Sequence, residues 1–539
     1  MIDSPQDAPP SGPAARAVMR QIEQAARRVT RSLDAVMHRL YGSRGNPLHQ
    51  SGALAAWLLA VLTVTGLYLL LFYRIGAPAQ SVQRLAADPW LGAWIRSLHR
   101  YATDAFVIAA VLHAVRLAGQ AREWGPRTRA WVTGVFLVGL GLGCAWSGFV
   151  MAWDSFGMRL AVAGARLIDW LPIVSEPVGR IFAGDRPPPS AFFFLNLFLH
   201  IAIPLGMGVG LWLHVSKVAR PTLIPPRGVR WGVTGVLTLA SILLPAALGP
   251  AAIPLTLPSE TPVDLVTAWW LPFAEDAPGS MVWLALVAAT LAVLLVPWFS
   301  RRPRSASWAP SHVDPRLCTG CDQCTQDCPW EAIAMVPRTD DRPTLVALVD
   351  PQLCVSCGIC AGSCAPMGVG PPTRTGRDQL AALDAGPLAA LLAAPVDERV
   401  VVIRCAQTPD GVRRKLAEAG ARLHEVPCVG GVHSSVIERY LRHSAAGVMI
   451  AGCPPRDCVG REGPKWLEQR TYHDREAELQ PRVDRRRVRI ATFAVGLDDD
   501  AVAAFEQFRR DVLQLALPFA EESAVVDAQC ESAPSMADA

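Results

Sequence analysis

The chain has 539 residues, of which 51% are hydrophobic and 18% charged, and its formal net charge is +4. This length and apolar content exclude a single ordinary soluble domain and indicate several modules, some of them within a membrane. So small a charge on so long a chain gives no support for nucleic-acid binding. The first fifty residues are polar and bear arginines, without a secretory signal, so we expect synthesis to begin in the cytosol.

The N-terminal segment, residues 1–45, is predicted to be a cytosolic tail with an amphipathic helix. Apolar side chains recur among its arginines at roughly helical spacing, at Val18, Ile22, Val29, Leu33 and Met37. Such a pattern is typical of a helix at the membrane interface, although an ordinary surface helix is the simpler interpretation and the one we prefer. We also expect His38 and His49 to be surface residues.

Six apolar runs are long enough to cross a bilayer. They lie near residues 53–73, 93–117, 131–151, 192–214, 229–249 and 280–299. These runs predict a six-helix transmembrane bundle within residues 46–300. Lysine and arginine gather after the second, fourth and sixth runs, whereas residues 250–278 contain neither. By the positive-inside rule, both termini should be cytoplasmic.

Two of these runs each carry two histidines fourteen residues apart, His99 with His113 and His200 with His214. On a helix, fourteen residues make nearly four turns and advance about 21 Å, so both imidazoles share one face. Polar groups within a span are costly, and two imidazoles can be the axial ligands of a haem. We predict an outer haem held by His99 and His200 and an inner haem held by His113 and His214. Buried histidines satisfied by hydrogen bonds are the alternative, which the repeated spacing disfavours.

The stretches GAWIRSLHRYATDAFVIAAVLHAVR and WSGFVMAWDSFG, together with His200 and His214, resemble cytochrome b of the quinol-oxidising bc and bf complexes. The resemblance implies two b haems, with Arg96 and Arg100 as candidate partners of their propionates. Snorkelling of both arginines to the interface is the alternative. Cys144 is the only cysteine in the membrane part, so covalent haem attachment has no support.

The family's Pro-Glu-Trp-Tyr motif aligns with the tetrad Thr267-Ala268-Trp269-Trp270, and Ala152 stands where the family usually has proline. The glutamate that is thought to take a quinol proton in the family is therefore missing. Asp264 or Asp154 could replace it, although an exposed loop carboxylate is the simpler interpretation of each. We therefore expect quinone chemistry beside the inner haem.

Two cysteine runs, CTGCDQCTQDCPW and CVSCGICAGSCAP, repeat the spacing C-x-x-C-x-x-C-x-x-x-C-P and resemble bacterial two-cluster ferredoxins. In that family the fourth cysteine of each run ligates the other [4Fe-4S] cluster. The resemblance assigns Cys318, Cys321, Cys324 and Cys364 to cluster 1, and Cys328, Cys354, Cys357 and Cys360 to cluster 2. Zinc is the alternative for four thiolates.

Strand-like and helix-like runs alternate from residue 398 onward and predict a small parallel α/β domain. Cys405, Cys428 and Cys453 each follow a predicted strand, and Cys458 lies in the next loop, so the four should meet at the carboxyl edge of the sheet. The stretch VPCVGGVHSSVIERYLRHSAAGVMIAGCPPRDC resembles the delta subunit of methyl-viologen-reducing hydrogenase. That resemblance implies a [2Fe-2S] cluster and a flavoprotein partner of the heterodisulfide-reductase type. A structural zinc site is the alternative.

The predicted fold class is multidomain: a six-helix haem-binding membrane bundle, a two-cluster ferredoxin domain and a small parallel α/β domain. The expected segments are 1–45, the membrane domain 46–300, a linker 301–312, the ferredoxin domain 313–375, a connecting segment 376–397, the delta-like domain 398–515 and a disordered tail 516–539.

The predicted sites form an electron-transfer path that runs from the C-terminal [2Fe-2S] site through both ferredoxin clusters to the inner and then the outer haem. We expect an electron-transfer subunit of the bacterial cytoplasmic membrane, lipid-embedded and with its iron-sulfur domains cytoplasmic. It would link a cytosolic flavoprotein or dehydrogenase to quinone, and a homodimer is allowed. No flavin or nucleotide motif occurs in the chain. The alternatives are an anchoring subunit without quinone chemistry and a haem conduit to an outer-face protein acceptor.

Overall fold

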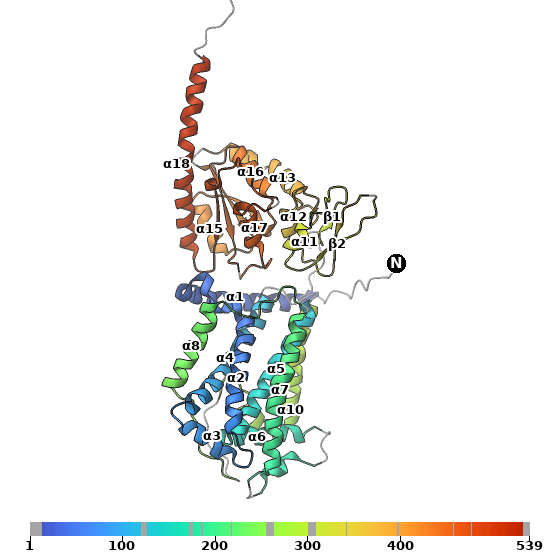
Figure 1. The fold of residues 1–539 in the computed structure, drawn as a ribbon, viewed down its shortest axis with the longest axis vertical. Coiled ribbons are helices and arrows are strands. Elements are labelled where there is room, and N and C mark those ends of the chain that lie inside the picture. Colours follow the sequence, from blue (N-terminus) through green and yellow to red (C-terminus); the bar gives the residue numbers. More distant parts are fainter. Residues whose placement is uncertain are drawn as a thin grey trace, which may run out of the picture. The chain divides into compact units, whose positions relative to one another are not determined.

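The computed structural model describes residues 13–119, 127–171, 176–184, 187–216, 218–254, 264–299, 309–340, 342–395, 398–455, 457–475 and 477–531 (Figure 1). The chain forms two compact units. One unit comprises Met1–Thr30 with Gly45–Arg302, and the other comprises Arg31–Arg44 with Pro303–Ala539. The predicted linker falls largely outside the described residues.

The first unit is helical. Its main helices are α2 (Ser51–Phe72), α3 (Pro78–Ala87), α4 (Gly92–Gly119), α5 (Thr128–Ala152), α6 (Ser155–Asp169), α7 (Ser190–Ser216), α8 (Arg227–Leu243), α9 (Leu271–Asp276) and α10 (Gly279–Phe299). Helix α2 packs along α4, and α5 packs along α7, so that two helix pairs form the centre of this unit (Figure 1). Small residues such as Ala102 and Ala109 are buried in this centre and allow the helices to approach closely.

Five helical segments of the described chain are long and apolar enough to cross a membrane: Pro47–Phe72, Gly92–Gly119, Thr128–Ala152, Ser190–Ser216 and Gly279–Phe299. The prediction of six spans is not confirmed. The predicted fifth span corresponds to α8, which has 17 residues and is about 26 Å long, shorter than the roughly 30 Å hydrocarbon core. It ends at Leu243 because Pro245 disfavours helical geometry at Leu244.

Helix α8 nevertheless runs along most of α4. Near its start, Trp231 lies edge-on against Trp57 of α2, with ring centroids 5.5 Å apart. Beyond its end, the Leu244 carbonyl accepts a hydrogen bond of 2.6 Å from Tyr101, and the Ala246 amide donates to Ser97 at 2.9 Å. Helix α8 and the residues that follow it therefore contact the α2–α4 pair from Trp57 to Ser97.

The N-terminal helix α1 (Pro13–Gly45) has the predicted amphipathic character. Val18, Ile22 and Val29 stay exposed to 56%, 46% and 52%. The expectation that His38 is a surface residue is wrong, since this side chain is 3% exposed and its Nδ1 lies 3.2 Å from the Val495 carbonyl oxygen. Helical periodicity could not identify this partner, because it comes from a loop 457 residues later in the chain.

The second unit begins with a small ferredoxin-type domain. Strand β1 (His312–Val313) pairs antiparallel with β4 (Val369–Gly370), and β2 (Ile333–Val336) pairs antiparallel with β3 (Val346–Val349). Two single-turn helices, α11 (Gln323–Asp327) and α12 (Ile359–Ser363), lie within the two cysteine motifs. This duplicated arrangement reflects the repeated cysteine run of the sequence.

The rest of this unit is built on a four-stranded parallel sheet, which confirms the predicted α/β domain. Its strands are β5 (Val400–Cys405), β6 (Arg422–Val426), β7 (Gly447–Gly452) and β8 (Val488–Thr492), in the order β6-β5-β7-β8. Helices α15 (Asp410–Glu418) and α18 (Asp498–Glu531) contribute to the core on one face. Helices α16 (Ser434–Arg442) and α17 (Gly463–Tyr472) contribute to the core on the other.

Two segments differ from their predicted roles. The connecting segment 376–397 contains helices α13 (Gly376–Asp384) and α14 (Pro387–Leu392), whose Leu383, Leu388 and Leu391 are buried in the core of the α/β domain. Helix α18 runs on to Glu531, whereas a disordered tail was expected from residue 516. Residues 532–539 lie outside the described part of the chain.

Candidate functional site

Four imidazoles lie at two levels of the first, helical unit. The ring centroids of His99, on α4, and His200, on α7, are 6.4 Å apart. His113 and His214 lie fourteen residues further along the same helices and are likewise neighbours. The structure therefore brings together the same two pairs that the fourteen-residue spacing predicted.

A glycine lies against each of these imidazoles. A methyl group on Gly66 or Gly148 would approach Cε1 of His99 or His200 to 3.3 and 3.0 Å, respectively. At the other level, the corresponding distances are 2.7 Å from Gly52 to His113 and 3.2 Å from Gly134 to His214. These glycines come from α2 and α5 and are also fourteen residues apart within each helix. Glycine at these positions of α2 and α5 thus lets each imidazole lie against the helix backbone, where a larger side chain would displace the ring.

Hydroxyl groups fix the orientation of three of the rings. Thr65 Oγ1 lies 2.8 Å from His99 Nδ1, Thr133 Oγ1 lies 3.1 Å from His214 Nδ1, and Ser147 Oγ lies 3.0 Å from His200 Nδ1. Each hydroxyl already donates its proton to a carbonyl of its own helix. It must therefore accept from Nδ1–H, which leaves Nε2 as the unprotonated nitrogen available to a metal.

This donor set fits two bis-imidazole haems: the rings are paired, three of them have a free Nε2, and each ring lies against a glycine of a neighbouring helix. The sequence-based prediction missed the glycines and the hydroxyls. The signal that could have revealed them is a Ser-Gly or Thr-Gly dipeptide that occurs twice in each of α2 and α5, at Ser51-Gly52, Thr65-Gly66, Thr133-Gly134 and Ser147-Gly148. In both helices its spacing equals that of the histidines.

The two arginines near His99 have protein partners. Arg96 donates to the Ala246 carbonyl, and Arg100 forms ion pairs with Asp104 and Asp264. The guanidinium of Arg100 also lies 4.7 Å above the Phe149 ring centroid. Both guanidinium groups are thus held close to the His99 level, where haem propionates would need counter-charges.

In the described part of the chain, the carboxylates near the degraded motif are engaged in structural bonds. Asp264 accepts from the amides of Val266 and Thr267, and it pairs with Arg100. Asp154 caps α6 at the Gly157 amide, 2.8 Å away, and accepts from the Gly249 amide at 2.9 Å. Neither is the exposed loop carboxylate that was the simpler interpretation, and neither carries a free oxygen toward a quinol.

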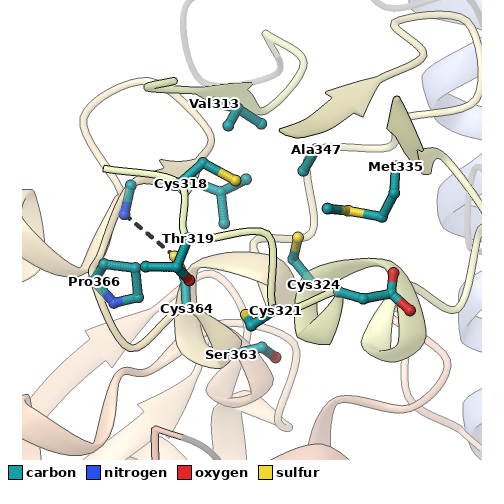
Figure 2. A pocket seen from close by; sticks show the side chains of 13 residues that line it. Val313, Cys318, Thr319, Cys321, Cys324, Met335, Ala347, Ser363, Cys364 and Pro366 are labelled. Carbon is teal, nitrogen blue, oxygen red and sulfur yellow. Dashed lines mark hydrogen bonds between the residues drawn. The ribbon is translucent and has the colours of Figure 1, made fainter. Parts of the chain in front are cut away.

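One pocket of the ferredoxin domain is lined by Cys318, Cys321, Cys324 and Cys364, and Figure 2 shows these four side chains around it. These are the residues predicted for cluster 1, including the cross-over from the second run. The Gly368 amide donates to Cys364 Sγ at 3.3 Å, a type of hydrogen bond that tunes iron-sulfur sites. Burial raises the pKa of the Cys324 thiol to about 12, so this sulfur stays protonated at neutral pH until a metal displaces the proton.

The residues predicted for cluster 2 also gather in one place. Cys328, Cys354 and Cys357 all lie within electrostatic range of Cys360. The amides of Ala332 and Ser311 donate to Cys328 Sγ and Cys354 Sγ, both at 3.4 Å. Four neighbouring cysteines, two of which accept N–H···S bonds, suit an iron-sulfur cluster at this position as well.

The carboxyl edge of the parallel sheet brings together the four cysteines of the third candidate site. Cys405 Sγ and Cys453 Sγ are 3.7 Å apart, close to the roughly 3.8 Å that two tetrahedral bonds of about 2.3 Å to one metal would require. Cys428 and Cys458 form a second hydrogen-bonded pair, and both sulfurs lie within 3.4 Å of a methyl group placed on Gly463. Two pairs of sulfurs are the arrangement that a two-iron cluster needs.

The third site adjoins cluster 2. A methyl group on Gly460 would lie 3.2 Å from Cys428 Sγ and 3.8 Å from Cys357 Cβ. Around this point the two domains meet through glycine backbone, with Gly358 and Gly362 on the ferredoxin side and Gly430, Gly431 and Gly463 on the other. We call these five glycines the interdomain junction. They allow an approach that side chains would prevent.

Three family models match separate parts of the chain. They are cytochrome b/b6/petB over residues 39–221, the 4Fe-4S dicluster domain over 317–368, and the methyl-viologen-reducing hydrogenase delta subunit over 404–516. The chain combines a cytochrome b domain, a dicluster ferredoxin domain and a hydrogenase delta-subunit domain. All three resemblances stated from the sequence are confirmed. Cytochrome b implies haem b, and the dicluster domain implies [4Fe-4S] clusters.

Relatives match the cytochrome b domain. "Cytochrome b6" of Heliobacterium mobile is 28% identical over 178 residues, which cover 32% of this chain and 84% of that protein. "Menaquinol:cytochrome c reductase cytochrome b subunit" of Geobacillus thermodenitrificans is 22% identical over 173 residues, covering 31% and 77%. The solved structure "Hyperthermophilic respiratory Complex III" aligns with a TM-score of 0.36 at 18% identity, covering 46% of this chain and 74% of that one.

The substitution Gly148→Ala should lower the haem content of the purified protein, because the new methyl group would stand 3.0 Å from His200 in the space beside the ring. Gly143→Ala on the same helix is the matched control, since a methyl group there meets nothing within 4 Å. Haem per polypeptide is measured by pyridine haemochrome absorbance. Equal haem content in both variants would contradict a cofactor beside Gly148.

Thr65→Val should raise the midpoint potential of one haem. The hydroxyl accepts from His99 Nδ1–H and so makes the imidazole a better electron donor, which favours oxidised iron. Thr63→Val is the control, because Thr63 lies on the same helix and its hydroxyl is exposed and donates to the Leu59 carbonyl of that helix. An optical redox titration compares the two variants, and an unchanged potential in Thr65→Val would refute the role of the hydroxyl.

Cys453→Ser should remove the [2Fe-2S] signal in EPR and about two iron atoms per chain, while the [4Fe-4S] signals persist. The reason is that Cys453 and Cys405 are placed to bind the same metal ion. Metal analysis of the unsubstituted protein is the companion measurement. Stoichiometric zinc that disappears with this substitution would instead establish the zinc alternative.

Proposed function

We propose that this chain is the membrane subunit through which a cytosolic flavoprotein or dehydrogenase, of the heterodisulfide-reductase type, exchanges electrons with the quinone pool. The observation that carries the proposal is the pairing of His99 with His200 and of His113 with His214 at two levels of one bundle. The second unit of the same chain holds three cysteine sites, two of which adjoin one another. A cytochrome b domain joined to iron-sulfur domains supports a membrane electron-transfer subunit.

The proposed cofactors are two b haems, two [4Fe-4S] clusters and one [2Fe-2S] cluster. The haems would be held by the two histidine pairs, with Arg96 and Arg100 positioned for the outer propionates. The [4Fe-4S] clusters would be held by the two ferredoxin sets, and the [2Fe-2S] cluster by Cys405, Cys428, Cys453 and Cys458. Bound there, these groups supply one-electron chemistry, while the protein sets their spacing, burial and hydrogen bonds.

The quinone site is proposed to lie beside the inner haem, at the level of His113 and His214. The outer motif lacks its glutamate, and Asp154 and Asp264 are both engaged in structural hydrogen bonds. Glu275, five residues after the tetrad, is also engaged, since both its oxygens accept from Arg159. A relative named as a menaquinol:cytochrome c reductase subunit supports quinone as the class of substrate.

The iron-sulfur domains are proposed to face the cytoplasm. Arginines of the described chain lie at the ends of the helices near Arg116, Arg127 and Arg129, and again at Arg227 and Arg230. Positively charged connections of this kind favour the cytoplasmic side. This placement would present the delta-subunit domain to a soluble redox partner in the reducing compartment that suits its thiolates.

Reduced haem in the purified full-length protein should be reoxidised rapidly by a water-soluble naphthoquinone or benzoquinone analogue under anaerobic conditions. The measurement is stopped-flow absorbance of the b haems after reduction by limiting dithionite. Haem that ignores every quinone analogue would refute the quinone proposal and favour the anchoring role. Oxidation only by an outer-face protein acceptor would favour the conduit.

Trp269→Ala distinguishes the two possible positions of the quinone site. Trp269 belongs to the degraded outer tetrad and is 58% exposed, so its removal should not disturb the packing of the bundle. We expect an unchanged rate of haem oxidation by quinone, because the proposed site is at the inner level. A several-fold slower rate would move the site to the outer level.

A further inference from the structure

Arg470, on α17 of the delta-subunit domain, is a cation enclosed at the interdomain junction. It is 1% exposed. Its Nη1 donates to Ser363 Oγ at 2.8 Å, and its Nη2 donates to the Gly430 carbonyl at 2.6 Å. Ser363 belongs to the ferredoxin domain, between cluster ligands Cys360 and Cys364. The guanidinium group therefore crosses from one domain into the other.

The charges around Arg470 do not cancel. Asp327 is completely buried, and its Oδ2 lies 3.7 Å from Arg470 Nη1. The same carboxylate also pairs with Arg475 at 2.5 Å. Two arginines thus share one aspartate, which leaves an excess positive charge in an environment where electrostatic interactions are weakly screened.

Stability alone is a poor explanation for this arrangement. A buried ion pair seldom stabilises a fold more than apolar packing would. In addition, the buried Nε of Arg470 has no hydrogen-bond partner within the described chain. Burial lowers the pKa of Arg470 to about 10, so the guanidinium group keeps its charge at neutral pH.

Arg470 acts on both metal sites that meet at the junction, because Cys428 and Cys360 are within its electrostatic range. We propose that Arg470 sets the midpoint potentials of both sites, raising that of cluster 2 and that of the delta-subunit site. This inference rests on the proposed function, since it assumes iron-sulfur clusters at both positions.

The physical reason is the charge balance of reduction. Reducing either cluster adds one electron and no atoms, so the site gains one negative charge. Because the sites adjoin one another, a negative charge on one opposes reduction of the other. A cation fixed between them offsets part of this added negative charge at each site, so it stabilises both reduced forms and raises both midpoint potentials.

The test is an EPR-monitored redox titration of the full-length protein with dithionite as reductant, carried out on Arg470→Gln and Arg470→Lys. The glutamine variant removes the charge and should lower both potentials at unchanged iron content. The lysine variant keeps the charge, although it loses the forked hydrogen bonds, and should retain potentials closer to those of the unsubstituted protein. Arg439→Gln is the matched control, because it removes a partly exposed ion pair between Arg439 of α16 and Asp384 of α13. It should change neither potential.

Equal potentials in Arg470→Gln and the unsubstituted protein would overturn the inference. Equal shifts in the glutamine and lysine variants, or loss of the iron-sulfur signals in both, would also overturn it, because these results indicate a structural role. The titration involves no quinone. A potential shift would therefore stand even if quinone failed to oxidise the haems, and the two proposals can fail separately.

Discussion

The fourteen-residue repeat is the constraint on which the membrane half of this protein depends. It occurs on four helices, as histidines on α4 and α7 and as glycines on α2 and α5. Because α2 opposes α4 and α5 opposes α7, Gly66 meets His99 at one level and Gly52 meets His113 at the other. One residue inserted between the two histidines of a helix would rotate the second histidine by about 100° around the helix axis. The imidazole would then no longer face its glycine.

Much of this architecture could be predicted because its signals are local in the sequence. Histidine spacing predicted which imidazoles pair, and the ferredoxin motif predicted which cysteines share a pocket. The glycines that face the rings were missed because glycine is common in these helices. Gly139 and Gly143 lie on the same helix as Gly148, yet a methyl group on either would meet no atom of the described residues within 4 Å. The difference depends on the neighbouring helix, which a single segment does not reveal.

The remaining differences arise from contacts between residues far apart in the chain. An aspartate at position 264 suggests a free carboxylate until Arg100, 164 residues earlier, is placed beside it. Helix α8 was expected to continue to residue 249, although Pro245 already indicated an earlier end. Leu383 was assigned to a connecting segment, because the apolar residues that it contacts lie on strands that come later in the sequence. In each case tertiary packing decided the role of the residue.

Both halves of the protein use glycine to bring groups close together. Beside the imidazoles, glycine lets each ring lie against the backbone of a neighbouring helix, and at the interdomain junction it lets two backbones approach one another. A methyl group on Gly431 would lie 3.0 Å from the Gly358 carbonyl, so little room remains there for water or side chains. The junction is therefore a poorly solvated medium. In such a medium the charge of Arg470 is screened less than that of a partly exposed arginine such as Arg439.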